Sequence, residues 1–212
     1  QGRWWNMSLK KICILNYGSG NSMSVYNAIK FLKYKVILSN KIDDIKESTH
    51  LILPGVGSFK KTMEKIKKKL PIKFLNNQVT KQEKPILGIC VGMQVMSDFG
   101  YEFEKCPGLG WIHGEVKILK KQPQNVPHVG WNSLEIKKKH KILKNIDKED
   151  NFYFVHSYKF KTKSTKNSLS ITRYNENFSS IINSKNIFGF QFHPEKSQIS
   201  GLKLLKNFIE EV

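Results

Sequence analysis

A cysteine between two glycines, at the junction of an apolar run and a helical segment, constrains this chain more than any other feature. Residues 85–89 are typical of a buried strand, and residues 93–99 of the start of a helix. Gly88 and Gly92 stand two positions on either side of Cys90. Only glycine fits where a strand turns sharply into a helix. The spacing therefore predicts a nucleophile elbow, with the Cys90 thiol at a helix N-terminus that favours the thiolate.

The Gly-x-Cys-x-Gly pattern alone also fits a structural cysteine buried in an α/β core. A second motif, about a hundred residues later, favours the reactive alternative: an apolar strand ends in His193, and Glu195 follows two positions on. With the i, i+2 spacing of a strand, both side chains point the same way, so the carboxylate can fix the imidazole tautomer. His193-Pro194-Glu195 alone also fits a solvated turn, but with Cys90 it predicts a triad for nucleophilic catalysis.

Apolar runs alternate with helical stretches through the first half of the chain. Three runs are typical of buried strands: 11–16, 35–39 and 50–53. Asn21 or Ser22 can cap a first helix, and the lysine-rich stretch 60–77 predicts a further one. Strands that alternate with helices indicate a parallel sheet with helices on both faces.

The pattern changes after Phe99, where short β-rich runs and turns follow one another. Residues 178–182 and 187–191 predict a hairpin, and the apolar spacing over 202–209 predicts a closing helix. We therefore expect an α/β fold with a mostly parallel central sheet flanked by helices, and with antiparallel strands added in the C-terminal half. Residues 7–212 read as a single domain, whereas residues 1–6 precede Met7 and resemble the remnant of a cloning vector.

Composition narrows the function classes. Among 212 residues, no run approaches the roughly 18 apolar positions of a membrane span, and no apolar leader resembles a secretory signal. Three cysteines without such a signal predict free thiols in a reducing cytoplasm. The net charge of +19 raises a nucleic-acid alternative. The lysines are scattered, however, so we interpret most of them as solvated, with some facing an acidic partner.

The two motifs together resemble the class I (triad) glutamine amidotransferase family, and within it the glutaminase subunits of imidazole glycerol phosphate synthases. The resemblance extends from Lys10 to Val212. Its further motifs are the segments 16–21, 54–59, 127–132, 153–158 and 190–197. The resemblance implies the flavodoxin-like fold of this family and the hydrolysis of L-glutamine to glutamate and ammonia.

The resemblance also implies roles for individual residues. Cys90 would form a glutamyl thioester, His193 would transfer the protons, and Glu195 would orient His193. The oxyanion hole would comprise Val56, Gly57 and Val91. The positions expected to bind glutamine are Gly55, Gln94, His156, Ser157 and Tyr158. Gln94 alone also fits a glutamine that caps the core.

The implied partner is a cyclase subunit with a (β/α)₈ barrel, in a heterodimer through which ammonia is channelled. The positions expected to face this partner or gate the ammonia are Asn16, Trp131, Asn132, Tyr153 and Lys196. No cofactor is expected, because amide hydrolysis through a thioester needs none. No metal is expected either, since the chain lacks Cys-x-x-Cys and His-Glu-x-x-His spacings.

Two other functions stay open at this point. A paralogous glutaminase could feed ammonia to an amidating enzyme of surface-sugar or glycan biosynthesis, because the ammonia acceptor binds the partner. A basic nucleic-acid-binding module is the third alternative, which the intact Cys90, His193 and Glu195 disfavour. Val91 and Val129 depart from the residues usual in the family, leucine and methionine, but both changes are conservative in volume.

Overall fold

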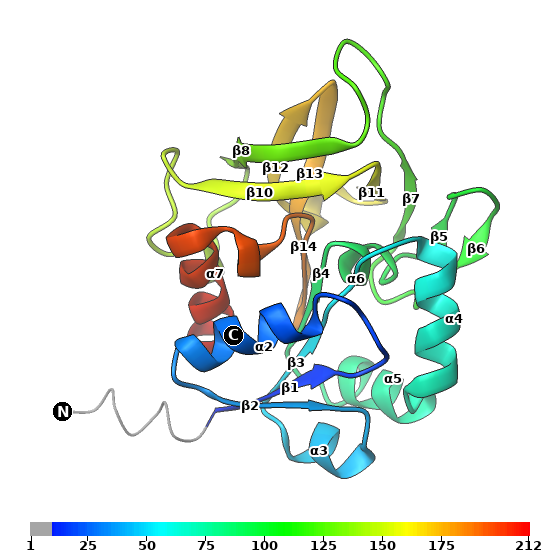
Figure 1. Ribbon diagram of the computed structural model, residues 1–212, viewed down its shortest axis with the longest axis vertical. Coiled ribbons are helices and arrows are strands. Elements are labelled where there is room, and N and C mark those ends of the chain that lie inside the picture. Colours follow the sequence, from blue (N-terminus) through cyan, green and yellow to red (C-terminus); the bar gives the residue numbers. More distant parts are fainter. Residues whose placement is uncertain (1–9) are drawn as a thin grey trace.

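The computed structural model describes residues 10–212, so the vector-like segment 1–6 and the first residues of the expected domain lie outside the described residues. Five parallel strands form the centre of the molecule (Figure 1). In spatial order they are β2 (Lys35–Ser39), β1 (Lys11–Leu15), β3 (His50–Leu53), β4 (Ile86–Ile89) and β14 (Ile187–Phe190). Short, mostly apolar runs predicted the strands of the first half, and β1, β3 and β4 are buried on both faces, whereas the edge strand β2 is only partly buried.

The same sheet continues beyond β14 with antiparallel strands. These are β13 (Glu176–Ser184), β12 (Ser168–Tyr174) and β9 (Glu135–Ile136). The predicted hairpin is confirmed as the pair β13 and β14, in which Ile182 lies opposite Gly189. The expected combination of a mostly parallel sheet with antiparallel strands from the C-terminal half is therefore confirmed.

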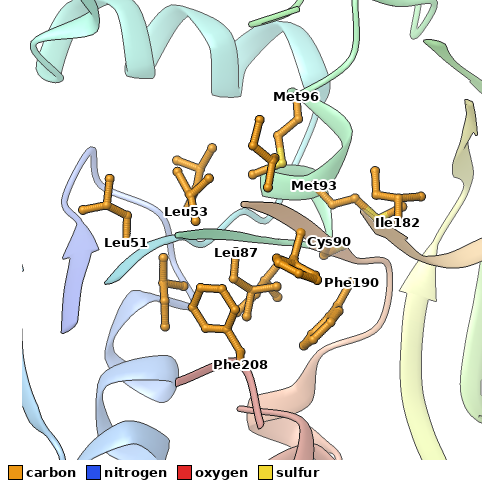
Figure 2. Close-up of a cluster of buried hydrophobic side chains, with 14 of the residues drawn as sticks. Leu51, Leu53, Leu87, Cys90, Met93, Met96, Ile182, Phe190 and Phe208 are labelled. Carbon is orange, nitrogen blue, oxygen red and sulfur yellow. The ribbon is translucent and has the colours of Figure 1, made fainter. Parts of the chain in front are cut away.

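Two layers of helices enclose the sheet (Figure 1). One face carries α2 (Ser22–Phe31) and α7 (Gln198–Glu211); the other carries α3 (Ile42–Glu47), α4 (Phe59–Lys69), α5 (Ile72–Thr80) and α6 (Val91–Gln94). Figure 2 shows the two halves of the core, with Met93 and Met96 on one side of the sheet and Phe208 on the other. Within residues 10–212, no helix has both the length and the apolar character needed to cross a membrane.

Two helix predictions are wrong in extent. The single helix expected over 60–77 is two helices, α4 and α5, because Pro71 pushes Leu70 into an extended conformation with φ −104° and ψ 147°. The helix expected over 93–99 runs instead from Val91 to Gln94. The helix ends there because residues 108–112 donate hydrogen bonds to the carbonyls that would continue it; the N–H of Leu109, for example, donates to the Val95 carbonyl at 2.7 Å.

Two smaller sheets cover the carboxyl ends of the central strands. Strands β8 (His128–Ser133) and β10 (Asn151–His156) form an antiparallel pair. The other sheet contains β11 (Tyr158–Thr162), β7 (Gly114–Ile118), β5 (Phe99–Gly100) and β6 (Cys106–Pro107). Only Ser157 separates β10 from β11, so the chain changes sheet at this corner.

Candidate active site

The turn between β4 and α6 has the strained geometry that the glycine spacing predicted. Cys90 has φ 53° and ψ −113°, outside the regions that non-glycine residues usually occupy. A Cβ on Gly92 would lie 2.0 Å from the carbonyl oxygen of Leu53, and one on Gly88 would lie 2.6 Å from that of Gly92. The backbones of the elbow and of β3 are therefore in direct contact, and the elbow can be built only with glycine on both sides of Cys90.

His193 and Glu195 meet beyond the end of β14. His193 Nδ1 lies 2.8 Å from Glu195 Oε1, and neither side chain has exposed surface. The expected contact is therefore present, but the strand-like spacing that predicted it is wrong. Residues Pro194–Lys196 form a 3₁₀ turn, and this turn folds Glu195 back onto the imidazole. His193 Nε2 has no hydrogen-bond partner among the described residues, so this nitrogen is available for proton transfer.

The surroundings of His193 favour its protonated form. Burial opposes a charged ring, but the interactions with Cys90 and Glu195 outweigh burial and raise the pKa of His193 to about 10. A protonated imidazole beside the nucleophile is a group that can give a proton to a leaving nitrogen.

A cavity of about 320 Å³ opens in front of Cys90. It brings together most of the positions expected at the site: Cys90, His193, Val56, Gly57, Val91, Gln94, His156, Ser157 and Tyr158. Val91 is the first residue of α6, and Gly57 has φ 102°. Gly55 does not line the cavity; a Cβ there would meet the Gly92 nitrogen at 2.2 Å. Gly55 therefore packs directly against the backbone of the elbow.

Gln94 is held in the cavity wall by both of its amide protons. Its Nε2 donates to the Tyr158 carbonyl at 2.9 Å and to Gln191 Oε1 at 3.1 Å. Gln191 is fully buried, and its own Nε2 lies 3.9 Å from Cys90 Sγ. Within the part of the chain that the structure describes, Gln94 Oε1 accepts no hydrogen bond. The atom that Gln94 can offer to a bound molecule is therefore an acceptor.

Three residues that sequence analysis did not assign contribute to the site. Asn21 occupies the expected N-cap position of α2, but its side chain makes no capping bond; its Nδ2 donates instead to Glu195 Oε1 at 3.1 Å and so supports the triad. Glu102 is the only acidic residue that the described chain contributes to the cavity lining. His128 lies behind the wall, with its Nδ1 3.1 Å from His156 Nε2. The motif 16–21 contained the signal for Asn21, whereas no local pattern marks Glu102.

The expected partner-facing positions do not all lie together. Trp131 and Tyr153 are cross-strand neighbours on β8 and β10 with ring centroids 5.9 Å apart, and Lys196 Nζ lies 5.9 Å from the Tyr153 ring. Asn132 instead turns its amide inward, to His128 and the Arg173 carbonyl. Asn16 is exposed after β1, where its N–H donates to Ser39, and it does not line the cavity.

No group of three histidine, cysteine or acidic side chains within residues 10–212 is arranged to hold a metal ion. All three cysteines of the chain, Cys13, Cys90 and Cys106, are free thiols. The reactive groups that the structure places at the cavity are the Cys90 thiol and the buried His193 imidazole, with the Glu195 carboxylate hydrogen-bonded to the imidazole.

Comparison with known proteins shows the family to which this fold and this site belong. Residues 13–212 match the family model "Glutamine amidotransferase class-I". Imidazole glycerol phosphate synthase subunit HisH 2 of Pseudomonas aeruginosa is 40% identical over 95% of this chain and 100% of its own length. Subunit HisH 1 of Campylobacter jejuni strain RM1221 is 43% identical over 93% of this chain and 98% of its own.

Solved structures agree on the fold. The structure of PurLQS from Thermotoga maritima superposes with a TM-score of 0.72 at 19% identity, over 95% of this chain and 98% of that one. A crystal structure described as a glutamine amidotransferase gives a TM-score of 0.71 at 16% identity, over 94% and 97% of the two chains. The expected fold class is thus confirmed.

Proposed function

The chain belongs to the class-I glutamine amidotransferase family, and on that premise we propose that it is the glutaminase subunit of an imidazole glycerol phosphate synthase. It hydrolyses L-glutamine to glutamate and ammonia, which a synthase subunit uses in histidine biosynthesis. The observation that carries this function is the Cys90 elbow facing a cavity with His193 and Glu195 beside it. We propose that residues 7–212 act as a single domain in the cytoplasm.

The first half-reaction forms a thioester. Cys90 Sγ attacks the side-chain carbonyl carbon of glutamine, and the carbonyl π electrons move to oxygen. His193, which holds the thiol proton on Nε2, gives it to the leaving nitrogen as the C–N bond breaks and ammonia departs. Glu195 accepts a hydrogen bond from His193 Nδ1 and so keeps Nε2 directed at the reacting atoms.

The second half-reaction returns the enzyme to its starting state. His193 takes a proton from water, the hydroxide attacks the thioester carbonyl carbon, and the C–S bond breaks to give glutamate and the Cys90 thiolate. Both half-reactions place negative charge on the carbonyl oxygen. The N–H of Val91, next to the nucleophile, and the backbone of the Val56–Gly57 loop are the donors that we assign to it.

The polar groups of the wall fit the amino-acid end of glutamine. The α-ammonium group needs acceptors, and the cavity offers the Glu102 carboxylate and Gln94 Oε1. The α-carboxylate needs donors, which the backbone at Ser157 and Tyr158 supplies. A site that pairs both charged groups selects a free amino acid over a glutamine within a peptide.

An apolar surface beside the cavity fits the partner subunit. Val129 and Trp131 of β8 and Val155 of β10 are 56%, 49% and 37% exposed, and Tyr153 completes this outer face. Ammonia released into water at neutral pH is mostly protonated and no longer nucleophilic. A partner that covers this face would receive it before protonation, and we propose a cyclase with a (β/α)₈ barrel in a heterodimer, with Lys196 at the rim.

Glutamate release from glutamine tests the function directly. The chain is assayed alone, with a cyclase subunit of an imidazole glycerol phosphate synthase, and with that subunit plus its ribonucleotide substrate. We expect strong stimulation by the complex, no activity in Cys90→Ala, and a loss of partner affinity of about 2 kcal/mol in Trp131→Ala. Ile42→Ala, at an exposed residue of α3, serves as the matched control.

Absence of stimulation would contradict the histidine-pathway assignment. If Cys90 were still alkylated by a glutamine analogue, the chain would be a glutaminase with another ammonia acceptor, such as a sugar-amidating enzyme. If it were not alkylated, the glutaminase activity itself would be ruled out.

A further inference from the structure

The inner face of the β8–β10 pair carries two buried histidines in register. His128 and His156 are directly opposed in the antiparallel pairing, and they are only 2% and 6% exposed. His128 Nδ1 lies 3.1 Å from His156 Nε2. The glutaminase mechanism uses neither ring for proton transfer, although His156 forms part of the cavity wall.

The direction of the His128–His156 hydrogen bond follows from the contact that the other nitrogen of His156 makes. His156 Nδ1 lies 2.8 Å from the Tyr158 carbonyl oxygen, which can only accept, so the proton of His156 is on Nδ1. His156 Nε2 then has a lone pair, and His128 Nδ1 must donate to it. His128 Nε2 is in turn an acceptor, and Asn132 Nδ2 lies 3.4 Å from it. One carbonyl thus fixes the tautomers of both rings.

The hydrogen-bonded series Asn132–His128–His156 is held by backbone groups at both of its ends. Asn132 Oδ1 accepts the Ser133 N–H at 2.9 Å, which sets the orientation of the amide, and its Nδ2 also donates to the Arg173 carbonyl at 3.2 Å. At the other end, the Tyr158 carbonyl accepts from Gln94 as well as from His156. The hydrogen bonds therefore reach the same oxygen that holds the glutamine-facing amide.

Packing keeps His128 in place and uncharged. Its ring stacks between Tyr174 and Phe154, with centroid distances of 4.0 and 4.9 Å. Burial lowers the pKa of His128 to about 4 and that of His156 to about 3. Both rings are therefore neutral donor–acceptor groups at neutral pH, as the tautomer assignment requires.

We propose that Asn132, His128 and His156 form a directional hydrogen-bonded chain that fixes the Ser157–Tyr158 corner, which makes His128 and Asn132 positioning residues for glutamine. The corner is where the polypeptide changes sheet, and its carbonyl at Ser157 is held from the other side by Leu119. Because it assigns a role in glutamine binding, this inference rests on the proposed function.

Covalent labelling of Cys90 tests the inference without the partner subunit. The probe is 6-diazo-5-oxo-L-norleucine, a glutamine analogue that alkylates a nucleophilic cysteine, and intact mass gives KI and the maximal rate kinact separately. His128→Phe keeps the aromatic stack but cannot donate, whereas His128→Gln can donate and accept but loses the stack. We expect His128→Phe to raise KI about tenfold with kinact unchanged, and His128→Gln to keep KI near the wild-type value. Asn132→Ala should raise KI about threefold.

The pattern across the two variants decides the outcome. A wild-type KI in His128→Phe, or an equal rise in both variants, would overturn the inference, because packing alone would then account for the shape of the corner. Iodoacetamide, which lacks the amino-acid end, should alkylate Cys90 at the same rate in all variants and so shows that the triad is intact. Absence of labelling in the wild-type chain would overturn the proposed function itself, and this inference with it.

Discussion

The cavity has a histidine on each of its two sides, and the surroundings of the two rings shift their pKa values in opposite directions. His193, on the side of the parallel sheet, meets Cys90 and Glu195, and its pKa is raised to about 10. His156, on the side of β10, hydrogen-bonds to a neutral ring and a carbonyl, and burial lowers its pKa to about 3. His193 interacts with Cys90 and with the Glu195 carboxylate, whereas His156 has no such partners, and this difference distinguishes the ring that transfers protons from the ring that supports the cavity wall.

The two sides also differ in how they are supported. Backbone contact at Gly55, Gly88 and Gly92 fixes the elbow, where no Cβ would fit. Hydrogen bonds from the Gln94 and His156 side chains to the Tyr158 carbonyl, and between His128 and His156, fix the wall at Ser157 and Tyr158. Close-packed backbone cannot shift without a clash, so the nucleophile has a rigid support. The recognition wall is held instead by individual hydrogen bonds, each of which a single substitution can remove.

The largest expected effect is on glutamine hydrolysis, and it comes from a substitution that should leave glutamine binding unchanged. Cys90→Ala should lower glutamine hydrolysis by about four orders of magnitude, because the nucleophile is lost. Calorimetry should still detect glutamine binding, since the wall is unchanged. Loss of binding together with activity would show that the two sides are not independent.

A glycine substitution tests the rigid support. Gly92→Ala should destabilise the fold by about 3 kcal/mol or more in urea unfolding, because its Cβ would lie 2.0 Å from the Leu53 carbonyl. Gly130→Ala is the matched control, since that glycine has φ 136° but a Cβ there would meet no described atom within 4 Å. It should cost only the backbone strain, about 1–2 kcal/mol. Equal losses would argue against the steric account of the elbow.

A smaller effect is expected on the recognition side. Glu102→Gln removes the negative charge that we assign to the α-ammonium group, and should raise KM for glutamine about tenfold while kcat is retained. The amide can still accept the hydrogen bond that Phe59 donates to Glu102 at 2.7 Å. Glu104→Gln, at a carboxylate paired with Lys60, should leave KM unchanged. A fall in kcat with unchanged KM would assign Glu102 to the chemistry.

The last prediction concerns stability in acid. The pKa of His128 is about 4 in the folded chain, against 6.5 for a solvated histidine, so below pH 6.5 the unfolded chain binds a proton that the folded chain does not. The free energy of unfolding should therefore fall between pH 6.5 and 4, and His128→Phe should make this slope shallower by up to about 1.4 kcal/mol per pH unit. Val129→Ala, on the opposite face of the strand, should leave the slope unchanged. An unchanged slope in His128→Phe would contradict a buried neutral ring.

The parts of the fold that could be predicted from the sequence are those with a local signal. The β4 elbow follows from glycine spacing, and the parallel strands follow from short apolar runs whose neighbours are helical. The break at Pro71 also had a local signal, but the lysine-rich amphipathic pattern on both sides obscured it. The early end of α6 had none, because the groups that terminate it come from residues 108–112.

The candidate site divides in the same way. Cys90, His193 and Glu195 could be predicted because motif and chemistry coincide in a few consecutive residues. Glu102 and His128 could not, since each acquires its position through partners far along the chain. Asn132, which was expected to face the partner, hydrogen-bonds to His128. Side chains alternate along β8, so His128 and Asn132 lie on one face and Trp131 on the other. Which of these faces is buried can be decided only when the register of this six-residue strand is known.

The position of β14 determines when the active site can exist. During synthesis the ribosome delivers Cys90 with β4 about a hundred residues before His193 emerges, yet β14 must insert beside β4 for the two to meet. This closure is among the most non-local steps of folding, and such steps are slow. A nascent chain, or one truncated before β14, therefore contains the thiol without its base and cannot consume glutamine. Hydrolysis begins only when the last strand of the sheet is in place.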